Sequence, residues 1–157
     1  MIPVRRISIT AASVVAVSCI AFGGQTLGPN VTKAEAAQSG ASCNNQIITT
    51  SGQIPSKGSA NTQANRNCLL AQGNYGTAVF ALQLSIGYCY GLSTGSPPGR
   101  PDAIFGGVTK ASLKTIQGRI GTGQDGVYGN NTHNKMQFWQ RYQNGRHYCY
   151  LDPTKVS

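Results

Sequence analysis

The sequence predicts an all-α fold, a small three-helix bundle with an irregular, disulfide-tied N-terminal arm. Three segments after residue 69 carry apolar side chains at helical spacing. A glycine follows each of them, as expected at the end of a helix. Residues 37–67, by contrast, are rich in Ser, Gly, Asn, Gln and Thr and nearly lack large apolar side chains. We therefore expect an irregular polar arm at 37–72, a helical domain at 73–143 and a C-terminal tail at 144–157.

A secretory signal peptide is predicted for residues 1–36. Arg5 and Arg6 precede an uncharged run from 7 to 22, and Ala34-Glu35-Ala36 places small residues where signal peptidase needs them. The run is shorter than the roughly 20 residues of a membrane-spanning helix, so no stable membrane anchor is expected. Export by the twin-arginine route and lipidation at Cys19 are the alternatives. We therefore expect a secreted protein.

Four cysteines remain after residue 36, and their even number in an exported chain predicts two disulfides. They are Cys43, Cys68, Cys89 and Cys149. The sequence leaves all three pairings open. Cys43 with Cys68 and Cys89 with Cys149 is preferred, because each bond would tie a tail to the helical core. No two cysteines have Cys-x-x-Cys spacing, so neither a metal site nor thiol redox chemistry is expected.

Each predicted helix carries three apolar residues on one face. The triplets are Val79, Leu82 and Ile86, then Val108, Leu113 and Ile116, and finally Met136, Trp139 and Tyr142. The helices are expected to end at Gly87, at Gly118 and at Asn144-Gly145. Helices of about ten residues are not stable alone, so these faces should pack together. Between the first two lies LSTGSPPGRP, residues 92–101, which we interpret as a long surface loop.

The segments 102–117 and 125–140 repeat one pattern at a constant offset of 23 residues. The matched pairs are Asp102 and Asp125, Phe105 and Tyr128, Gly106 and Gly129, Thr109 and Thr132, Leu113 and Met136, Ile116 and Trp139, and Gln117 and Gln140. Each aspartate should accept hydrogen bonds from the next turn, and each aromatic residue should enter the core. The glycine should permit a sharp turn, and the threonine should satisfy free N–H groups at the helix start.

Together with GTAVFALQLSIGY at 76–88, these two repeats resemble the peptidoglycan-binding domain found at the ends of many bacterial cell-wall hydrolases. The resemblance covers about residues 73–143. It implies a compact three-helix fold and peptidoglycan as the ligand, bound without a cofactor. The chain departs from the family pattern at Ala103, at Ile116 and in the expanded loop at 92–101.

Peptidoglycan offers sugar faces, amides and carboxylates to a protein surface. Candidate ligand-binding residues outside the apolar stripes are Tyr88, Tyr90, Arg119, Asn130, Asn131, Arg141 and Tyr142. Trp139 is assigned to the core because its counterpart in the repeat is Ile116. Both histidines, His133 and His147, are expected to face solvent.

The charged residues further limit the classes of partner and of chemistry that we expect. The chain after residue 36 contains ten basic side chains and three carboxylates. The resulting net charge of +7 favours anionic partners. The charges are scattered, so nucleic acid is not expected as a partner, and too few carboxylates remain for paired acid–base catalysis. We expect a secreted, non-catalytic module that binds peptidoglycan. The alternative is a secreted interaction protein, an inhibitor or accessory partner of an exported enzyme.

Overall fold

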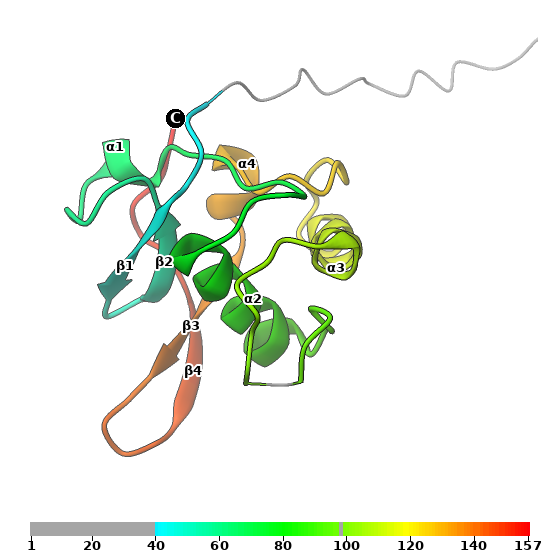
Figure 1. Cartoon of the computed structure of the whole chain (residues 1–157). Coiled ribbons are helices and arrows are strands. Elements are labelled where there is room, and N and C mark those ends of the chain that lie inside the picture. The colour runs from blue at the N-terminus through cyan, green and yellow to red at the C-terminus, as the bar shows by residue number, and fades with distance from the viewer. Residues whose placement is uncertain (1–39, 98) are drawn as a thin grey trace, which may run out of the picture. The chain divides into compact units, whose positions relative to one another are not determined.

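The computed structural model describes residues 40–97 and 99–157, and these form a mixed α/β fold (Figure 1). The elements in chain order are β1 (Asn45–Thr49), β2 (Gly52–Ser56), α1 (Gln63–Arg66), α2 (Thr77–Tyr90), α3 (Gly107–Arg119), α4 (Asn130–His133), β3 (Gln137–Arg141) and β4 (His147–Leu151). The strands form two antiparallel two-stranded sheets. The predicted all-α bundle is therefore wrong. The predicted signal peptide lies outside the described residues.

Helix α2 lies at the centre of the fold because it is apolar on nearly every side. Its residues from Ala78 to Ile86 are buried, except Phe80, which is half-buried. Such a helix needs cover all round, and both hairpins and α3 provide it (Figure 1). The helix continues through Gly87, its predicted end. It stops instead at Gly91, whose φ of 64° gives the left-handed conformation that commonly ends a helix.

Helix α3 matches the second predicted helix, with one difference on its surface. Leu113 and Ile116 are fully buried, as the helical spacing predicts. Val108 is 48% exposed, so it does not belong to the core face. The remaining buried positions of α3 are polar, and these side chains take part in the site described below.

The segment predicted as an irregular arm contains a β-hairpin. β1 and β2 pair with Ile47 opposite Ile54, and both side chains are buried. A strand needs apolar residues only at alternate positions, so two isoleucines suffice to attach this polar hairpin to the core. A disulfide between Cys43 and Cys68 joins the start of the hairpin to the segment after α1. The pairing is the one preferred from the sequence.

The third predicted helix exists only as the short α4, after which the chain extends into β3. β3 pairs with β4, a strand formed by the predicted tail, and Trp139 lies opposite Cys149. The neighbours Phe138 and Trp139 are both buried, on opposite faces of the hairpin, which a helical stripe cannot achieve. Aromatic residues favour strands, and the disulfide from Cys89 to Cys149 fixes the hairpin to α2.

A buried ion pair joins α1 to the chain that follows β4. The Arg66 guanidinium donates a hydrogen bond to the Asp152 carboxylate, and both side chains are almost fully buried. His133 Nε2 lies 3.3 Å from the same carboxylate, and the other ring nitrogen lies 2.9 Å from the Tyr128 hydroxyl. His133 is therefore an interior residue, and its predicted position in solvent is wrong.

Candidate functional site

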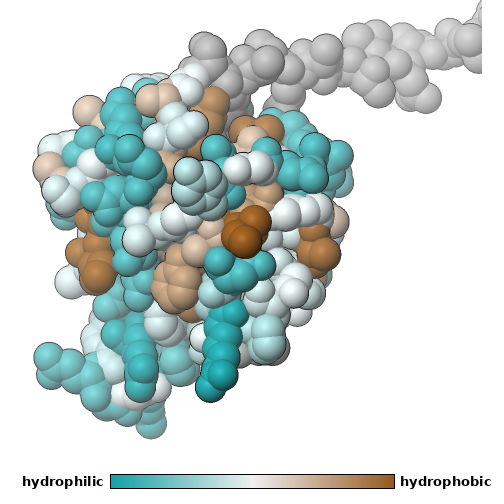
Figure 2. All heavy atoms as spheres, in the orientation of Figure 1, coloured by the Kyte–Doolittle hydropathy of each residue, from teal (hydrophilic) through white to brown (hydrophobic). Residues whose placement is uncertain are grey.

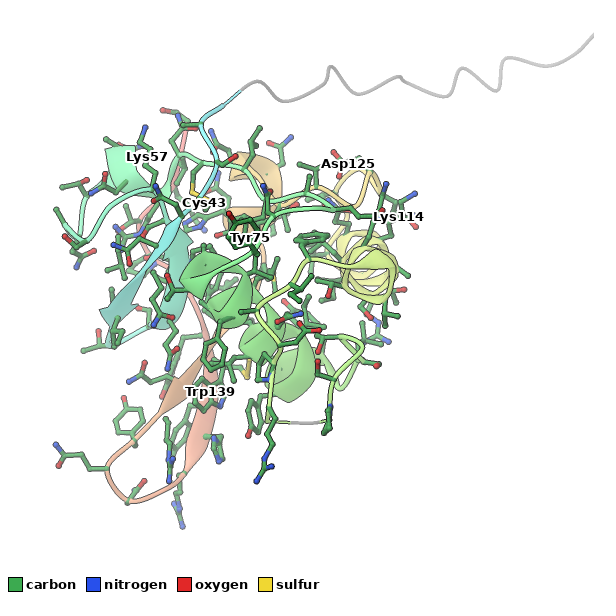
Figure 3. All side chains as sticks on the ribbon, in the orientation of Figure 1. Cys43, Lys57, Tyr75, Lys114, Asp125 and Trp139 are labelled. Carbon is green, nitrogen blue, oxygen red and sulfur yellow. A yellow bond between two sulfur atoms is a disulfide. The ribbon has the colours of Figure 1, made fainter. Side chains whose placement is uncertain are left out.

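Two loop-to-helix turns, at residues 102–109 and 125–132, have the same hydrogen-bond pattern. Asp102 Oδ1 accepts a bond of 2.9 Å from the Ile104 amide, and Asp125 Oδ1 accepts one of 2.8 Å from the Val127 amide. Both aspartates thus make the backbone contacts predicted for them. Asp125 lies in its loop beside α3, as Figure 3 shows. Each turn leads directly into a helix, the first into α3 and the second into α4.

A buried glutamine from the preceding helix holds each turn. Gln83 Nε2 donates to Asp102 Oδ1 at 2.8 Å, to the Ile104 carbonyl at 3.0 Å and to Thr109 Oγ1 at 3.2 Å. Its Oε1 accepts from the Ala103 amide at 2.9 Å. Gln117 makes the four equivalent contacts in the second turn, at 2.7, 3.0, 3.1 and 2.8 Å. The repeat in the sequence thus corresponds to one structural unit that occurs twice, a turn held by a buried glutamine amide. We call each of these units a junction.

The two threonines of the repeat belong to these junctions rather than to helix caps. Neither α3 nor α4 has a side-chain hydrogen bond at its N-cap. Thr109 Oγ1 accepts from Gln83 and donates to the Thr94 carbonyl at 3.1 Å, so it also anchors the 92–101 loop. The predicted capping role is wrong, because each threonine hydroxyl accepts from a glutamine amide and donates to a carbonyl instead of accepting from a backbone N–H. Phe105 and Tyr128 are buried, as predicted.

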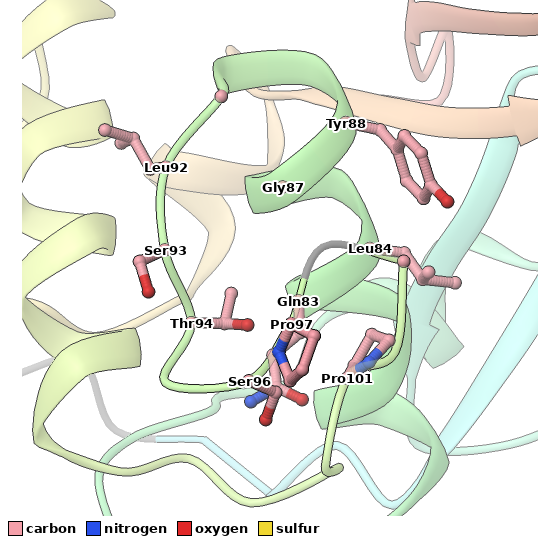
Figure 4. Close-up of a pocket in the computed structure, with 12 residues that line it drawn as sticks. Gln83, Leu84, Gly87, Tyr88, Leu92, Ser93, Thr94, Ser96, Pro97 and Pro101 are labelled. Atoms are coloured by element: carbon pink, nitrogen blue, oxygen red, sulfur yellow. The ribbon is translucent and has the colours of Figure 1, made fainter.

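A cavity of about 320 Å³ lies between the second half of α2 and the 92–101 loop (Figure 4). From α2 it is lined by Gln83, Leu84, Gly87 and Tyr88, and from the loop by backbone, prolines and the hydroxyl side chains of Ser93, Thr94 and Ser96. A Cβ at Gly99 would lie only 2.5 Å from the Tyr88 hydroxyl, so the loop packs tightly against the hydroxyl end of this side chain. The cavity therefore combines an aromatic wall with hydroxyl and amide groups.

Tyr88 is held in place by a stack of rings from the C-terminal hairpin. Its ring centroid lies 5.0 Å from that of Trp139 and 4.8 Å from that of His147, with nearly parallel planes. Trp139 Nε1 donates to His147 Nδ1 at 2.9 Å. Trp139, labelled in Figure 3, is only 6% exposed and supports Tyr88 from inside, whereas Tyr88 is 42% exposed. His147 is exposed, as predicted.

The seven predicted ligand-binding residues lie in three separate places. Tyr88, Tyr90 and Arg119 lie at the C-terminal ends of α2 and α3, where Arg119 donates to the Tyr90 carbonyl at 3.2 Å. The Tyr90 hydroxyl accepts from the Gln137 amide at 2.7 Å, so it links α2 to β3. Of these three, Tyr88 alone lines the cavity.

The other four candidates lie away from that cavity. Asn130 and Asn131 belong to α4, where Asn130 Nδ2 donates to the Ser157 carbonyl at 3.2 Å. Asn131 lines a second hollow of about 240 Å³ together with Lys135. Arg141 and Tyr142 lie at the turn end of the β3–β4 hairpin. The structure therefore does not bring the seven candidates together into one site.

The turn that borders the 92–101 loop carries a fixed negative charge. The backbone amide of Ile104 and then the Gln83 side chain lower the pKa of Asp102 below its usual 3.8. Elsewhere, burial raises the pKa of the Tyr90 hydroxyl, which stays protonated at neutral pH. On the face drawn in Figure 2, hydrophobic residues form separate spots among polar ones. The pictured face thus carries several separate hydrophobic spots rather than one continuous patch.

Sequence reasoning did not assign a role to several residues that matter here. The sequence pattern marks Gln117 as a repeated position, but it does not show that Gln117 or Gln83 holds a turn. It predicts a tail for Tyr148 and Tyr150, although their alternation with Cys149 is a strand signal. Their rings stack in the hairpin, with centroids 6.0 Å apart.

A family comparison agrees with the repeated turns. Residues 85–136 match the family model described as "Putative peptidoglycan binding domain". The match confirms, for this segment, the resemblance inferred from the sequence motifs. It begins within α2, spans both repeated turns and ends before β3, so both hairpins lie outside it. No curated protein matches the chain.

Among residues 40–97 and 99–157, every helix is too short or too polar to span a lipid bilayer. Nor do these ranges contain a group of three or more His, Cys, Asp or Glu side chains placed to hold a metal ion.

Proposed function

We propose that the chain is a secreted, non-catalytic module that binds peptidoglycan of the bacterial cell wall. The observation that carries this proposal is the family match over both repeated turns, together with the cavity that lies beside them. The two disulfides are consistent with an extracellular protein. The excess of basic side chains favours a polymer that carries carboxylates.

The cavity between α2 and the 92–101 loop has suitable chemistry for this ligand. Its volume of about 320 Å³ is at the lower end of the range typical of small-molecule sites. The Tyr88 ring offers an apolar face for a sugar, and the loop hydroxyls and carbonyls offer partners for amide and hydroxyl groups. Because Tyr88 rests on Trp139 and His147, its ring is already oriented before ligand arrives.

Sedimentation with purified, insoluble peptidoglycan tests the proposal. The chain from residue 37 should pellet with the polymer and should remain bound at moderate salt, because contacts inside a cavity are screened less than surface ion pairs. If it stays in the supernatant while an unrelated basic protein pellets, the proposed function is wrong. Binding that disappears as soon as salt is raised would show charge attraction alone, and would favour the alternative of a secreted partner for an exported protein.

A variant that fills the cavity locates the binding site. Gly87 lines the cavity in the last turn of α2, and a Cβ there would meet no atom within 4 Å. Gly87→Leu should therefore remain folded while lowering the affinity for peptidoglycan at least tenfold. Gly107→Leu is the matched control, since Gly107 also lies in a helix with open space around its Cβ but does not line the cavity. Equal binding by both variants would exclude the cavity as the site.

A further inference from the structure

The turn of the β3–β4 hairpin is built on Asn144-Gly145, which is the only Asn-Gly pair in the sequence. The Gly145 amide donates to the Tyr142 carbonyl at 2.9 Å, and the Tyr142 amide donates to the Arg146 carbonyl at 2.9 Å. Gly145 has a φ of 78°, which glycine adopts readily in hairpin turns. The turn lies at the end of the hairpin away from the helices (Figure 1), and residues 141–147 are all exposed, so water reaches it.

The Asn144 side chain is held against the backbone that follows it. Its Oδ1 accepts a hydrogen bond of 3.0 Å from the Arg146 amide, a local bond that asparagine commonly makes in turns. This bond draws electron density from the side-chain carbonyl, so Asn144 Cγ becomes a better electrophile. Gly145 supplies the next backbone nitrogen, and it has no Cβ to obstruct the approach of that nitrogen to Cγ. An electrophile and a nucleophile are therefore adjacent in an exposed turn.

We propose that Asn144 is a site of spontaneous deamidation, in which the Gly145 nitrogen attacks Asn144 Cγ. The nitrogen gives up its proton to water or hydroxide and forms a bond to Cγ. The bond from Cγ to Nδ2 breaks, and Nδ2 takes up a proton and leaves as ammonia. Water then opens the resulting succinimide ring at either carbonyl carbon, which leaves aspartate or isoaspartate at this position. This modification does not depend on the proposed function, because water is the only co-reactant.

The second junction shows why a following glycine is not sufficient for this reaction. Asp125 also precedes a glycine, but the Gly126 amide is buried and donates to Gln117 Oε1 at 2.8 Å. Asp125 Oδ1 is held by the Gln117 side chain and by the Val127 amide, at 2.7 and 2.8 Å. The atoms that would close a ring are thus fixed in separate bonds. In the exposed hairpin turn, water can replace the hydrogen bond of the Gly145 amide.

Conversion of Asn144 changes both the charge and the geometry of the hairpin turn. Residues 137–151 contain Arg141 and Arg146 and no carboxylate. The new carboxylate is ionised at neutral pH, so it lowers the positive charge of this segment by one. Isoaspartate also lengthens the main chain by a methylene group. The hydrogen bonds that Tyr142 makes across the turn should therefore weaken in the isoaspartate form.

Mass spectrometry of the folded, disulfide-intact chain tests the proposal. After incubation at mildly alkaline pH, the chain is unfolded, reduced and cut with trypsin, which releases residues 142–146 after Arg141 and Arg146. Fragmentation of this peptide should place the mass gain of an amide-to-carboxylate conversion on Asn144 rather than on Gln143. A sample without incubation gives the baseline, and incubation continues until a free peptide of residues 140–148 is half converted.

Asn131 is the control for exposure, because it is exposed but precedes the β-branched Thr132 within α4. Asn144 should convert at least about tenfold faster, since a branched neighbour obstructs the approach to Cγ and raises the barrier. Asn144→Gln is the matched variant. Its longer side chain closes a ring much less readily, so the peptide 142–146 should keep its mass. Unchanged fluorescence of Trp139, the only tryptophan, shows that this variant keeps the hairpin in place.

Cation-exchange chromatography provides a second measurement on the intact protein. A fraction of the incubated chain should elute earlier, and its aspartate form should elute with the Asn144→Asp variant. The proposal is overturned if Asn144 in the folded chain stays intact when half of the free peptide has been converted. Conversion of Asn131 as fast as that of Asn144 would also overturn it, because the turn would then confer no selectivity.

Discussion

At the residue scale, two glutamine side chains explain why the repeat exists. Gln83 and Gln117 each use both amide hydrogens and the carbonyl oxygen within one turn, so a single side chain replaces several backbone contacts. Gln140 occupies the third equivalent position but has no turn to hold, because the chain there is a strand. The same residue type is thus buried and fully hydrogen-bonded twice, whereas Gln140 Oε1 is buried without a partner among the described residues.

Ala103 is the residue at which the first turn departs from the second. Its φ is 59°, whereas the equivalent position in the second turn is Gly126 with a φ of 73°. A side chain in this region is strained, so Ala103→Gly should stabilise the protein by about 0.5–1 kcal/mol in urea unfolding. Gly126→Ala should destabilise it, since the new Cβ would lie 2.7 Å from Lys110 Cγ. A loss of stability in Ala103→Gly would contradict this account of the turn.

At the element scale, the C-terminal hairpin depends on its attachment to α2. The disulfide from Cys89 to Cys149, the Tyr88 stack and a bond of 3.1 Å from the Trp139 amide to Ser85 all connect these two elements. An isolated two-stranded hairpin is only marginally stable in water. The orientation of Tyr88 in the cavity therefore depends on this attachment.

Removal of this disulfide tests the attachment. It closes a loop of 60 residues, so Cys89→Ala with Cys149→Ala should lower the free energy of unfolding by about 4 kcal/mol. Trp139 fluorescence should shift to longer wavelength as the hairpin loosens.

Cys89 and Cys149 are half-buried, whereas Cys43 and Cys68 are nearly inaccessible, so mild reductant followed by alkylation should label the first pair first. Preferential labelling of Cys43 and Cys68 would contradict the burial seen here.

At the scale of the whole molecule, the Arg66–Asp152 pair joins segments from opposite ends of the described chain. Burial acts to raise the pKa of Asp152, but hydrogen bonds from His133, the Thr154 amide and Arg66 outweigh it and hold the pKa below 3.8. A carboxylate whose pKa is lowered by folding stabilises the fold fully above its ordinary pKa. That contribution is lost as the pH falls through the lowered value.

Acid unfolding should therefore depend on Asp152. The free energy of unfolding should decrease below about pH 4 in the unmodified chain. Asp152→Asn should cost about 3 kcal/mol at pH 7, because it leaves Arg66 buried without its partner, and it should show a weaker decrease in acid. Asp102→Asn is the comparison, since Asp102 is exposed and also has a lowered pKa. If Asp152→Asn kept the full acid dependence, the ion pair would not be its source.

The sequence predicted what depends on local pattern and missed what depends on distant partners. Two helices, the aspartate turns and the buried aromatic residues follow from spacing within about fifteen residues. The hairpins do not follow from local spacing. The run from Met136 to Tyr142 also fits a helix, and it becomes a strand because β4 pairs with it. Ile47 and Ile54 are recognised as core residues only once their hairpin is seen to pack on α2. The predicted ligand-binding residues do not form one site for the same reason. Their side-chain chemistry singles out Tyr88, Arg141 and Tyr142, but only the fold shows that Tyr88 lies apart from the other two.

The Arg66–Asp152 pair also bears on how the chain reaches its fold as it emerges from a ribosome. Arg66 appears 86 residues before the carboxylate that will neutralise it. During that interval the native position of α1 would bury an unpaired guanidinium, which is strongly unfavourable. The native position of α1 is therefore unfavourable until Asp152 has been added to the chain. We therefore expect α1 to take its native position only after synthesis has passed that turn.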